Sequence, residues 1–248
     1  MTKNISIVIL AAGKGTRMDS DIPKVLHKLN NISLIERVIK TTRNLNTSKT
    51  VIVVGHKKEL IKKSLDKQTS IEYAVQDKQK GTAHAVKMCF KNLKNFNGNV
   101  VILSGDVPLI SLETLKKLIN IKEHEDAKAS ILTANMENPD GYGRIIRNKR
   151  GLIKEMKEHK DCDKNELLNK EINAGIYVIE NRYLFNYIPK INNKNAQEEY
   201  YLPDLINLMI RDGESVATYN TSNIAEISGV NDKEQLKELE LYLKNDKK

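Results

Sequence analysis

The chain has no tryptophan, only three phenylalanines and only two cysteines among its 248 residues. Two cysteines, Cys89 and Cys162, cannot form a disulfide framework, which points to a reducing compartment. So few aromatic rings offer no obvious stacking platform for RNA bases. No apolar run is long enough to span a membrane, and the first one lacks the flanks and cleavage site of a signal peptide. We therefore expect a cytoplasmic protein that binds neither a membrane nor a nucleic acid.

The excess of positive charge does not change that expectation. The formal net charge is +9, but the lysines are spread along the chain in short pairs such as Lys57–Lys58 and Lys116–Lys117. We interpret the charge mainly as a compositional bias toward Lys, Asn and Ile, with some benefit for anionic substrates. A nucleic-acid-binding role remains a distant alternative, which a steep salt-dependent affinity for RNA would revive.

The first half of the chain alternates short apolar runs with helical spacing. Buried strands are expected at 5–10, 50–54, 71–75 and 99–103, and helices at 33–43, 59–65, 81–90 and from Ser111, a predicted N-cap. This alternation predicts an α/β fold with a doubly wound, mostly parallel mixed sheet. Ligands of such sheets bind beyond the carboxyl ends of the strands. The glycine-rich segment after the first strand and the Gly105–Asp106 pair are therefore expected to share one cleft.

The second half of the chain has a looser pattern. Strands are expected at 129–134, 172–179 and 215–218, hairpins and charged turns at 137–161, and helices at 198–211 and 232–243. No composition break or Pro/Gly/Ser linker divides the chain, and no hexapeptide repeat is present. We expect a single domain over 1–248, with a nucleotide-binding half at about 1–126 and a second half at about 127–248.

The segment from Ile5 to Lys24 carries the strongest chemical signal. It reads ISIVILAAGKGTRMDSDIPK, in which a buried strand runs into Gly13 and Gly15. The glycines allow a sharp turn and a close approach of the backbone, and the cations that follow can face one anion. The spacing fits neither a P-loop nor the dinucleotide-binding motif, which would need a third glycine. A phosphate site of another kind is indicated.

The full string resembles L-A-A-G-x-G-T-R-M…P-K, the signature of the sugar-1-phosphate nucleotidylyltransferases. It is most similar to the N-acetylglucosamine-1-phosphate uridylyltransferases among them. The resemblance covers about 5–239, with at least six motifs in the expected order. Longer members carry a left-handed β-helix acetyltransferase domain after this region, and the missing hexapeptide repeat predicts that this chain has none.

The resemblance implies how phosphates and metal are held. Asp106 follows a buried strand in SGDVPLI and matches the family motif G-D-x-P, which implies a Mg²⁺ ligand; taken alone it would be a turn or capping residue. Asn231 in GVND is implied as the second ligand, although alone it would read as a helix cap. Lys24 is implied to contact phosphate, and Arg17 to lie over the triphosphate and stabilise the leaving pyrophosphate.

The resemblance also implies the base site. The sequence VQDKQKGTAHA matches the family motif Q-x-x-x-x-G-T-x-H-A. Gln76 offers a donor and an acceptor to a pyrimidine edge, and Gly81 and Thr82 stand at a helix start. Without the first motif, Gln76 would be interpreted as a polar loop residue, and Gly81 and Thr82 as the ordinary start of a helix. We assign His84 no chemistry. Leu10, Ala11, Ala12 and Gly13 match the family segment whose backbone lies along the nucleotide, and Ser104 and Gly105 are expected as further substrate contacts.

The sugar contacts rest most heavily on the resemblance. GYGRI, EHKD and EINAGIY match the family in order, which implies Gly143, Glu158 and Asn173 as contacts to N-acetylglucosamine. Their alternative roles are a solvated hairpin charge for Glu158 and a strand-end turn residue for Asn173. Two departures from the family leave the hexosamine preference open: Pro203 stands where many relatives have threonine, and Ser104 occupies a variable position.

The activity implied is Mg²⁺-dependent transfer of UMP from UTP to N-acetylglucosamine-1-phosphate. The expected partners are these two substrates, with no obligate protein partner. A nucleotidylyltransferase for another sugar phosphate or base is the nearest alternative. From a different class, the chain could be a catalytically silent binding or assembly module, but the intact Arg17, Lys24 and Asp106 argue against it.

Overall fold

A nine-stranded mixed sheet forms the centre of the molecule in the computed structural model, which describes residues 4–245. Its main path runs β11-β7-β10-β6-β1-β4-β5. These strands are β1 (Ile5–Ala11), β4 (Lys49–Val54), β5 (Ile71–Val75), β6 (Asn99–Ser104), β7 (Ala129–Asn135), β10 (Glu171–Glu180) and β11 (Val216–Thr221). β5, β4, β1 and β6 are mutually parallel, whereas β10 runs antiparallel to both β6 and β7. The expected mostly parallel mixed sheet is confirmed.

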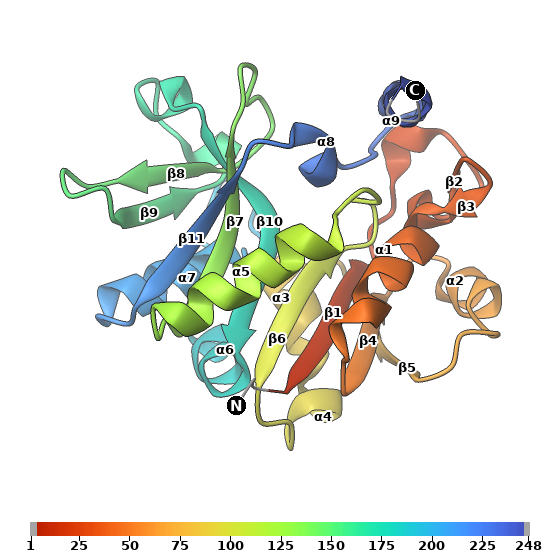
Figure 1. The fold of residues 1–248 in the computed structure, drawn as a ribbon, viewed down its shortest axis with the longest axis horizontal. Helices are drawn as coiled ribbons and strands as arrows, with labels where there is room; N and C mark the ends of the chain where they lie inside the picture. The colour runs from red at the N-terminus through yellow and green to blue at the C-terminus, as the bar shows by residue number, and fades with distance from the viewer. Residues whose placement is uncertain (1–3, 246–248) are drawn as a thin grey trace.

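Helices cover both faces of the sheet. One face carries α1 (Leu34–Thr42), α2 (Lys58–Ser64) and α5 (Leu112–His124), and the other carries α3 (Thr82–Lys87), α4 (Phe90–Leu93), α6 (Asn181–Tyr187) and α7 (Pro203–Arg211). Figure 1 shows α1 and α5 in front of the strands and α3 behind them. In β1, Ile7 and Ile9 pack into the core on one face and Val8 into the core on the other. Burial on both faces explains why the strand is a continuous apolar run.

Local signals start the helices where the sequence predicts. The Ser111 hydroxyl accepts a hydrogen bond from the Thr114 N–H at 3.0 Å and caps α5, as expected. Ser33 caps α1 in a reciprocal capping box with Glu36, a feature the sequence analysis did not use. Both caps satisfy N–H groups that a helix start leaves without partners.

Two expected helices are wrong in extent. The helix expected at 198–211 begins only at Pro203, because proline is suited to a first turn and not to a helix interior. The preceding Tyr200 instead donates its backbone N–H to the Lys80 carbonyl at 2.9 Å and accepts from the Ala83 N–H at 2.9 Å. The helix expected at 81–90 ends at Lys87, and a separate short helix, α4, follows.

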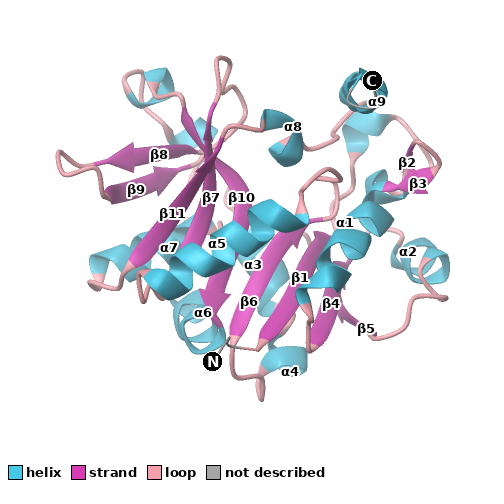
Figure 2. Ribbon diagram, viewed as in Figure 1, coloured by secondary structure: helices cyan, strands magenta, loops and turns pink. Residues whose placement is uncertain are grey.

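The second half adds a hairpin to the sheet. β8 (Arg144–Arg147) and β9 (Ile153–Lys157) pair antiparallel, which confirms the hairpin expected before 161, and β8 also pairs with β10. Figure 2 shows this hairpin projecting away from β1 and β4. A small ribbon of β2 (Lys28–Leu29) and β3 (Ile32–Ser33) and the C-terminal helices α8 (Ile224–Ile227) and α9 (Lys233–Asn245) complete the fold. Within 4–245, none of the helices is long and apolar enough to cross a membrane.

Candidate active site

The glycine loop that follows β1 folds back onto Lys24. Gly15 has a φ of +62°, and a Cβ on it would lie 2.6 Å from the Cβ of Lys24. Only glycine fits both the left-handed backbone and this close approach. The backbone of the loop therefore packs directly against the start of the Lys24 side chain.

Lys24 joins the two residues that the sequence analysis assigns to metal. Its ammonium donates a hydrogen bond to the Asp106 carboxylate and another, at 2.9 Å, to the Asn231 amide oxygen. The Lys24 and Asp106 side chains are only 16% and 17% exposed. The Val230 N–H donates to the Asp106 carbonyl at 2.9 Å, which brings the segment before α9 beside the end of β6. Residues from three distant parts of the chain thus meet at one point.

The donor set at this point suits a hard divalent cation. A carboxylate oxygen of Asp106 and the amide oxygen of Asn231 already converge on one cationic group. Mg²⁺ prefers such oxygen ligands, usually one or two from the protein together with phosphates and water. Among residues 4–245, no group of three or more His, Cys, Asp or Glu side chains could hold a metal ion. A metal bound here would need phosphate or water to complete its coordination.

A cleft of about 280 Å³ opens beside Lys24 and Asp106. The carboxyl ends of β1 and β6 form its floor, and the Gly105 N–H donates to the Leu10 carbonyl at 2.9 Å to hold these ends together. Ten of the residues that the sequence analysis selects line the cleft: Leu10, Ala11, Ala12, Gly13, Lys24, Gln76, Gly81, Thr82, Ser104 and Asp106. The expectation of one shared cleft at the strand ends is met by the geometry.

Arg17 lies apart from this group. It belongs to the short 3₁₀ turn Thr16–Met18 after the glycine loop, and its side chain is exposed. It does not line the cleft, and within 4–245 no hydrogen bond or ion pair holds it. The structure therefore leaves Arg17 at the edge of the site, attached to a loop that does line it.

The end of the cleft where the base is expected, called the base end below, is built by the connection from β5 to α3. Gln76 is 3% exposed, and its amide nitrogen donates to the Gly81 carbonyl at 3.1 Å. Gly81 has a φ of +100°, and a Cβ there would lie 2.5 Å from the Tyr200 carbonyl oxygen. The Thr82 hydroxyl accepts from the Leu202 N–H at 2.9 Å. These contacts tie the base end to the segment that begins α7.

A second cavity, of about 190 Å³, adjoins the first. Gly143, Glu158 and Asn173, the three expected sugar contacts, all line it. It shares Leu10, Thr82 and Ser104 with the first cleft. The expected nucleotide residues and the expected sugar residues therefore line two neighbouring cavities.

Asn173 is held rigidly in the second cavity. Its amide nitrogen donates to the Tyr177 hydroxyl at 2.6 Å, and its amide oxygen accepts from the Gly175 N–H at 3.0 Å. Asn173 is 8% exposed and Tyr177 is buried. Burial raises the pKa of the Tyr177 hydroxyl, so this group stays protonated. The Asn173 side chain is thus oriented before any ligand binds.

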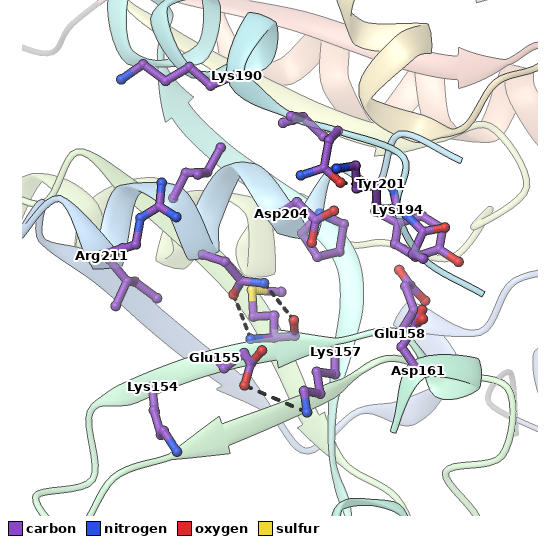
Figure 3. A pocket seen from close by; sticks show the side chains of 18 residues that line it. Lys154, Glu155, Lys157, Glu158, Asp161, Lys190, Lys194, Tyr201, Asp204 and Arg211 are labelled. Carbon is purple, nitrogen blue, oxygen red and sulfur yellow. Dashed lines mark hydrogen bonds and ion pairs between the residues drawn. The ribbon is translucent and has the colours of Figure 1, made fainter. Parts of the chain in front are cut away.

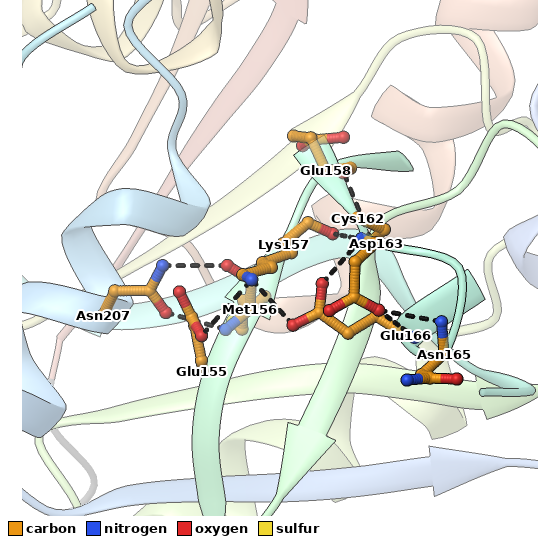
Figure 4. A network of polar contacts seen from close by, with 9 residues as sticks. All are labelled: Glu155, Met156, Lys157, Glu158, Cys162, Asp163, Asn165, Glu166 and Asn207. Atoms are coloured by element: carbon orange, nitrogen blue, oxygen red, sulfur yellow. Dashed lines mark hydrogen bonds and ion pairs between the residues drawn. The ribbon is translucent and has the colours of Figure 1, made fainter. Parts of the chain in front are cut away.

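Glu158 lies in an unusual electrostatic environment. The pKa of Glu158 is raised to about 7. The main cause is burial, and the negative charges of Asp161, Asp204 and Glu199 raise it further. Burial likewise raises the pKa of Asp204 to about 6. Figure 4 shows the surrounding contacts, in which the Cys162 thiol donates to the Glu158 carbonyl at 3.4 Å. Glu158 can therefore act as a hydrogen-bond donor or as an acceptor near neutral pH.

A larger cavity, of about 590 Å³, also includes Glu158 in its lining. Figure 3 shows lysines and an arginine interspersed with carboxylates around it, with Asp204 and Tyr201 in its middle. Neither Lys24 nor Asp106 lines this cavity. Lys24 and Asp106 instead line the cleft of about 280 Å³.

Several lining residues escaped the sequence analysis. Tyr142 and Tyr177 line the second cavity, and Glu199 lines the first. Both tyrosines stand inside quoted motifs, and Tyr177 shares the alternation of β10 with Asn173. That two-residue periodicity is a signal that could have identified Tyr177. Glu199 carries no such signal, because it reaches the cleft through the long-range pairing of Tyr200.

Arg144 braces the loop that enters the second cavity. Its guanidinium is fully buried and donates to the carbonyls of Pro139, at 2.7 Å, and of Tyr142. A third donation, at 3.4 Å, reaches the Leu167 carbonyl. A buried guanidinium requires such partners. Arg144 therefore fixes the backbone immediately before Gly143.

Comparison with known proteins places these features in a family. The family model for nucleotidyl transferases matches residues 6–225. The bifunctional protein GlmU of Bacillus licheniformis is 45% identical over 237 residues, which are 96% of this chain and 52% of that protein. The protein of the same name from Prochlorococcus marinus is 41% identical over 244 residues, 98% of this chain and 54% of that protein. The chain thus spans about half the length of the curated relatives it matches.

A solved structure shows the same fold. The structure of UDP-glucose pyrophosphorylase complexed with UDP-glucose superposes with a TM-score of 0.79, covering 99% of this chain and 100% of that one, at 17% identity. This likeness supports the α/β architecture, and the family match extends over most of the sheet and both cavities. The chain belongs to the nucleotidyl transferase family.

Proposed function

We propose that the chain transfers UMP from UTP to N-acetylglucosamine-1-phosphate in a Mg²⁺-dependent reaction that releases pyrophosphate. The observation that carries the proposal is the meeting of Lys24, Asp106 and Asn231 beside a cleft that is lined by Lys24 and Asp106 and adjoins a second cavity. One cavity is lined by small residues at the ends of strands, where a nucleotide can approach the backbone closely. The other has polar side chains suited to a sugar. The relatives named as bifunctional GlmU proteins support the same assignment.

The chemistry requires alignment and charge stabilisation. An oxygen of the sugar phosphate attacks the α-phosphorus of UTP, a new P–O bond forms, and the bridging bond to the β-phosphate breaks. The attacking phosphate is already ionised, so no general base and no covalent enzyme intermediate are needed. The main barrier is the crowding of negative charge around the α-phosphorus.

We assign the charges as follows. Asp106 and Asn231 would hold Mg²⁺, which supplies neutralisation of the phosphate oxygens when bound. Lys24 is hydrogen-bonded to both of these residues in the structure. With Mg²⁺ bound, its ammonium would instead donate a hydrogen bond to phosphate as a point charge. Arg17, exposed on its loop, would close over the triphosphate and stabilise the leaving pyrophosphate.

The substrate assignments follow the two cavities. We assign the base to Gln76, Gly81 and Thr82 and the ribose and phosphates to the backbone of 10–13 and 104–106. Gly143, Glu158 and Asn173 are assigned to the sugar. In this scheme 1–126 binds the nucleotide and 127–248 binds the sugar within one domain. The free cysteines Cys89 and Cys162 fit a cytoplasmic location, where UTP is made.

The direct test identifies the product. Purified protein is incubated with each of UTP, CTP, dTTP, ATP and GTP and with N-acetylglucosamine-1-phosphate or glucose-1-phosphate, and the products are identified by mass spectrometry. We expect UDP-N-acetylglucosamine and pyrophosphate to predominate. A strong preference for dTTP with glucose-1-phosphate would overturn the substrate assignment, and no product with any pair would favour a catalytically silent module.

The metal assignment has its own control. Asp106→Asn is expected to lower the rate at least about 100-fold, since it removes a charge from the metal site. Asp66→Asn, at an exposed aspartate away from the cavities, should leave the rate unchanged. Equal rates in the Asp106 and Asp66 variants would contradict the assignment.

A further inference from the structure

The side-chain amide of Gln76 has only one arrangement that its neighbours allow. The amide nitrogen lies 3.1 Å from the Gly81 carbonyl oxygen and 3.0 Å from Nδ1 of His84. A backbone carbonyl can only accept hydrogen bonds, so the NH₂ group must face it. With Gln76 3% exposed, turning the amide over would place two buried oxygen atoms against each other.

This arrangement determines the state of the histidine. The same NH₂ group faces Nδ1 of His84, so Nδ1 must carry a lone pair, and the proton of the neutral ring must be on Nε2. Burial lowers the pKa of His84, and the charges of Lys80 and Lys87 lower it further. The Tyr200 ring, 6.4 Å away between centroids, is the other titratable group beside it. The neutral ring is therefore the form present at neutral pH.

The two contacts leave one polar atom of Gln76 for a ligand. Both N–H groups of the amide point at Gly81 and His84, and within 4–245 no hydrogen bond uses Oε1 of Gln76. Gln76 lines the nucleotide cleft, and Oε1 is not among the buried atoms without a partner. The cleft thus offers a fixed acceptor at its base end.

A fixed acceptor selects among nucleobases by their protonation pattern. Uracil has a donor at N3, whereas cytosine has an acceptor at that position. An acceptor facing N3 stabilises uracil and places two lone pairs against each other with cytosine. Had the amide been free to turn over, its NH₂ group would have accommodated cytosine as well. The orientation of the amide therefore decides the selectivity.

We propose that His84 is a positioning residue for base selectivity, which acts by accepting a hydrogen bond from Gln76 and holding Oε1 toward N3–H of the base. This inference rests on the proposed function, because it takes the cleft as a uridine site. It gives His84 a role that its place in a helix did not reveal. A packing role alone would make an apolar residue of similar size an equal substitute.

The test compares the affinities for UTP and CTP, measured by isothermal titration calorimetry. His84→Leu removes the acceptor and should reduce the UTP/CTP affinity ratio about fivefold, the effect of losing one hydrogen bond. His84→Asn can place an amide oxygen near the position of Nδ1 and should restore the ratio to within about twofold of wild type. His124→Leu, at the exposed end of α5, is the matched control and should leave the ratio unchanged.

The outcomes separate this inference from the proposed function. A wild-type protein that binds UTP and CTP equally would overturn the uridine assignment itself. A wild-type preference for UTP that persists in full in His84→Leu would overturn only the role of His84. A second measurement uses the unaltered protein: two-dimensional ¹⁵N NMR of histidine-labelled protein should show the proton of His84 on Nε2 at neutral pH. A proton on Nδ1 would contradict the inference.

Discussion

The two cavities are built by different means. The cleft proposed for the nucleotide is lined largely by small residues, several of them at the ends of parallel strands, where the Gly105 N–H donates a hydrogen bond to the Leu10 carbonyl. The cavity proposed for the sugar depends on polar side chains: Arg144 is fully buried, Asn173 is hydrogen-bonded to Tyr177, and the pKa of Glu158 is raised. The first cavity is therefore shaped mainly by the backbone, and the second mainly by a network of side chains.

This difference has physical consequences. A backbone-lined cleft tolerates changes of side chain but not the addition of a Cβ where the chain passes close to itself. A buried polar network is stable only while every member keeps its partners, so single changes of polar groups affect it most. Variants in the backbone-lined cleft and in the side-chain network should therefore differ in their effects on activity and stability.

The largest effect is expected at the junction between the halves. Lys24→Met should reduce kcat about 100- to 1,000-fold, because it removes a positive charge from the reacting phosphates. Lys24→Arg should not restore the rate, since a planar guanidinium cannot replace a point charge in the same space. Lys28→Met, on the exposed side of β2, is the control. Steady-state kinetics that showed Lys24→Met to be as active as Lys28→Met would remove Lys24 from the chemistry.

A glycine comparison tests the backbone design. Gly81→Ala should lower the free energy of unfolding by about 3 kcal/mol, because it adds a clash with the Tyr200 carbonyl to the strain of a positive φ. Gly151→Ala also has a positive φ, of +77°, but open space around it, and should cost only about 1 kcal/mol. Urea denaturation of both variants measures the difference. Equal losses would mean that the approach to Tyr200 is not a constraint.

A tyrosine comparison tests the side-chain design. Tyr177→Phe removes the hydroxyl that accepts from Asn173 and should raise KM for the sugar phosphate about fivefold, the effect of one lost hydrogen bond. Neither kcat nor KM for UTP should change, since Asn173 faces only the sugar cavity. Tyr242→Phe, at a partly exposed position of α9, is the control. A matching rise in KM for UTP would contradict the separation of the two halves.

The smallest effect concerns the pH dependence of stability. Between its ordinary pKa of 4.5 and its raised pKa of about 7, Glu158 binds more protons in the folded protein than in the unfolded chain. The contribution of Glu158 to the free energy of unfolding therefore decreases as the pH rises through this window. Glu158→Gln should reduce the fall in the free energy of unfolding between pH 5 and 8 by on the order of 1 kcal/mol, because solvent screens the charge of a partly exposed group.

The control for that change is Glu238→Gln, at an exposed position of α9. It should leave the pH dependence of unfolding as it is in wild type. Urea titrations at pH 5, 6, 7 and 8 make the comparison. If the slopes of the Glu158 variant and the control were identical, the raised pKa of Glu158 would be wrong.

The sequence predicts the first half of the fold better than the second. β1, β4, β5 and β6 lie within one residue of the expected strands, because each is an apolar run buried on both faces. The helix expected from 198 was wrong, because 198–202 is held by long-range bonds between Tyr200 and the base end of the cleft. Local spacing contains no information about such a pairing.

The site follows the same division. Motif spacing placed Lys24 and Asp106 in one cleft, since both follow strands that end at the same edge of the sheet. It could not show that Lys24 bonds to both Asp106 and Asn231, which are 82 and 207 residues away along the chain. Nor could it show the contact of His84 with Gln76, which depends on the direction of a side chain within a helix.

The central claim is that Asp106 and Asn231 bring a metal-bound nucleotide to Lys24. The most direct measurement is the dissociation constant of UTP with and without Mg²⁺, for wild type and Asp106→Asn, by isothermal titration calorimetry. We expect Mg²⁺ to tighten UTP binding at least about tenfold in wild type, the effect of about 1.4 kcal/mol, and to have little effect in the variant. An equal effect of Mg²⁺ on both proteins would contradict the claim.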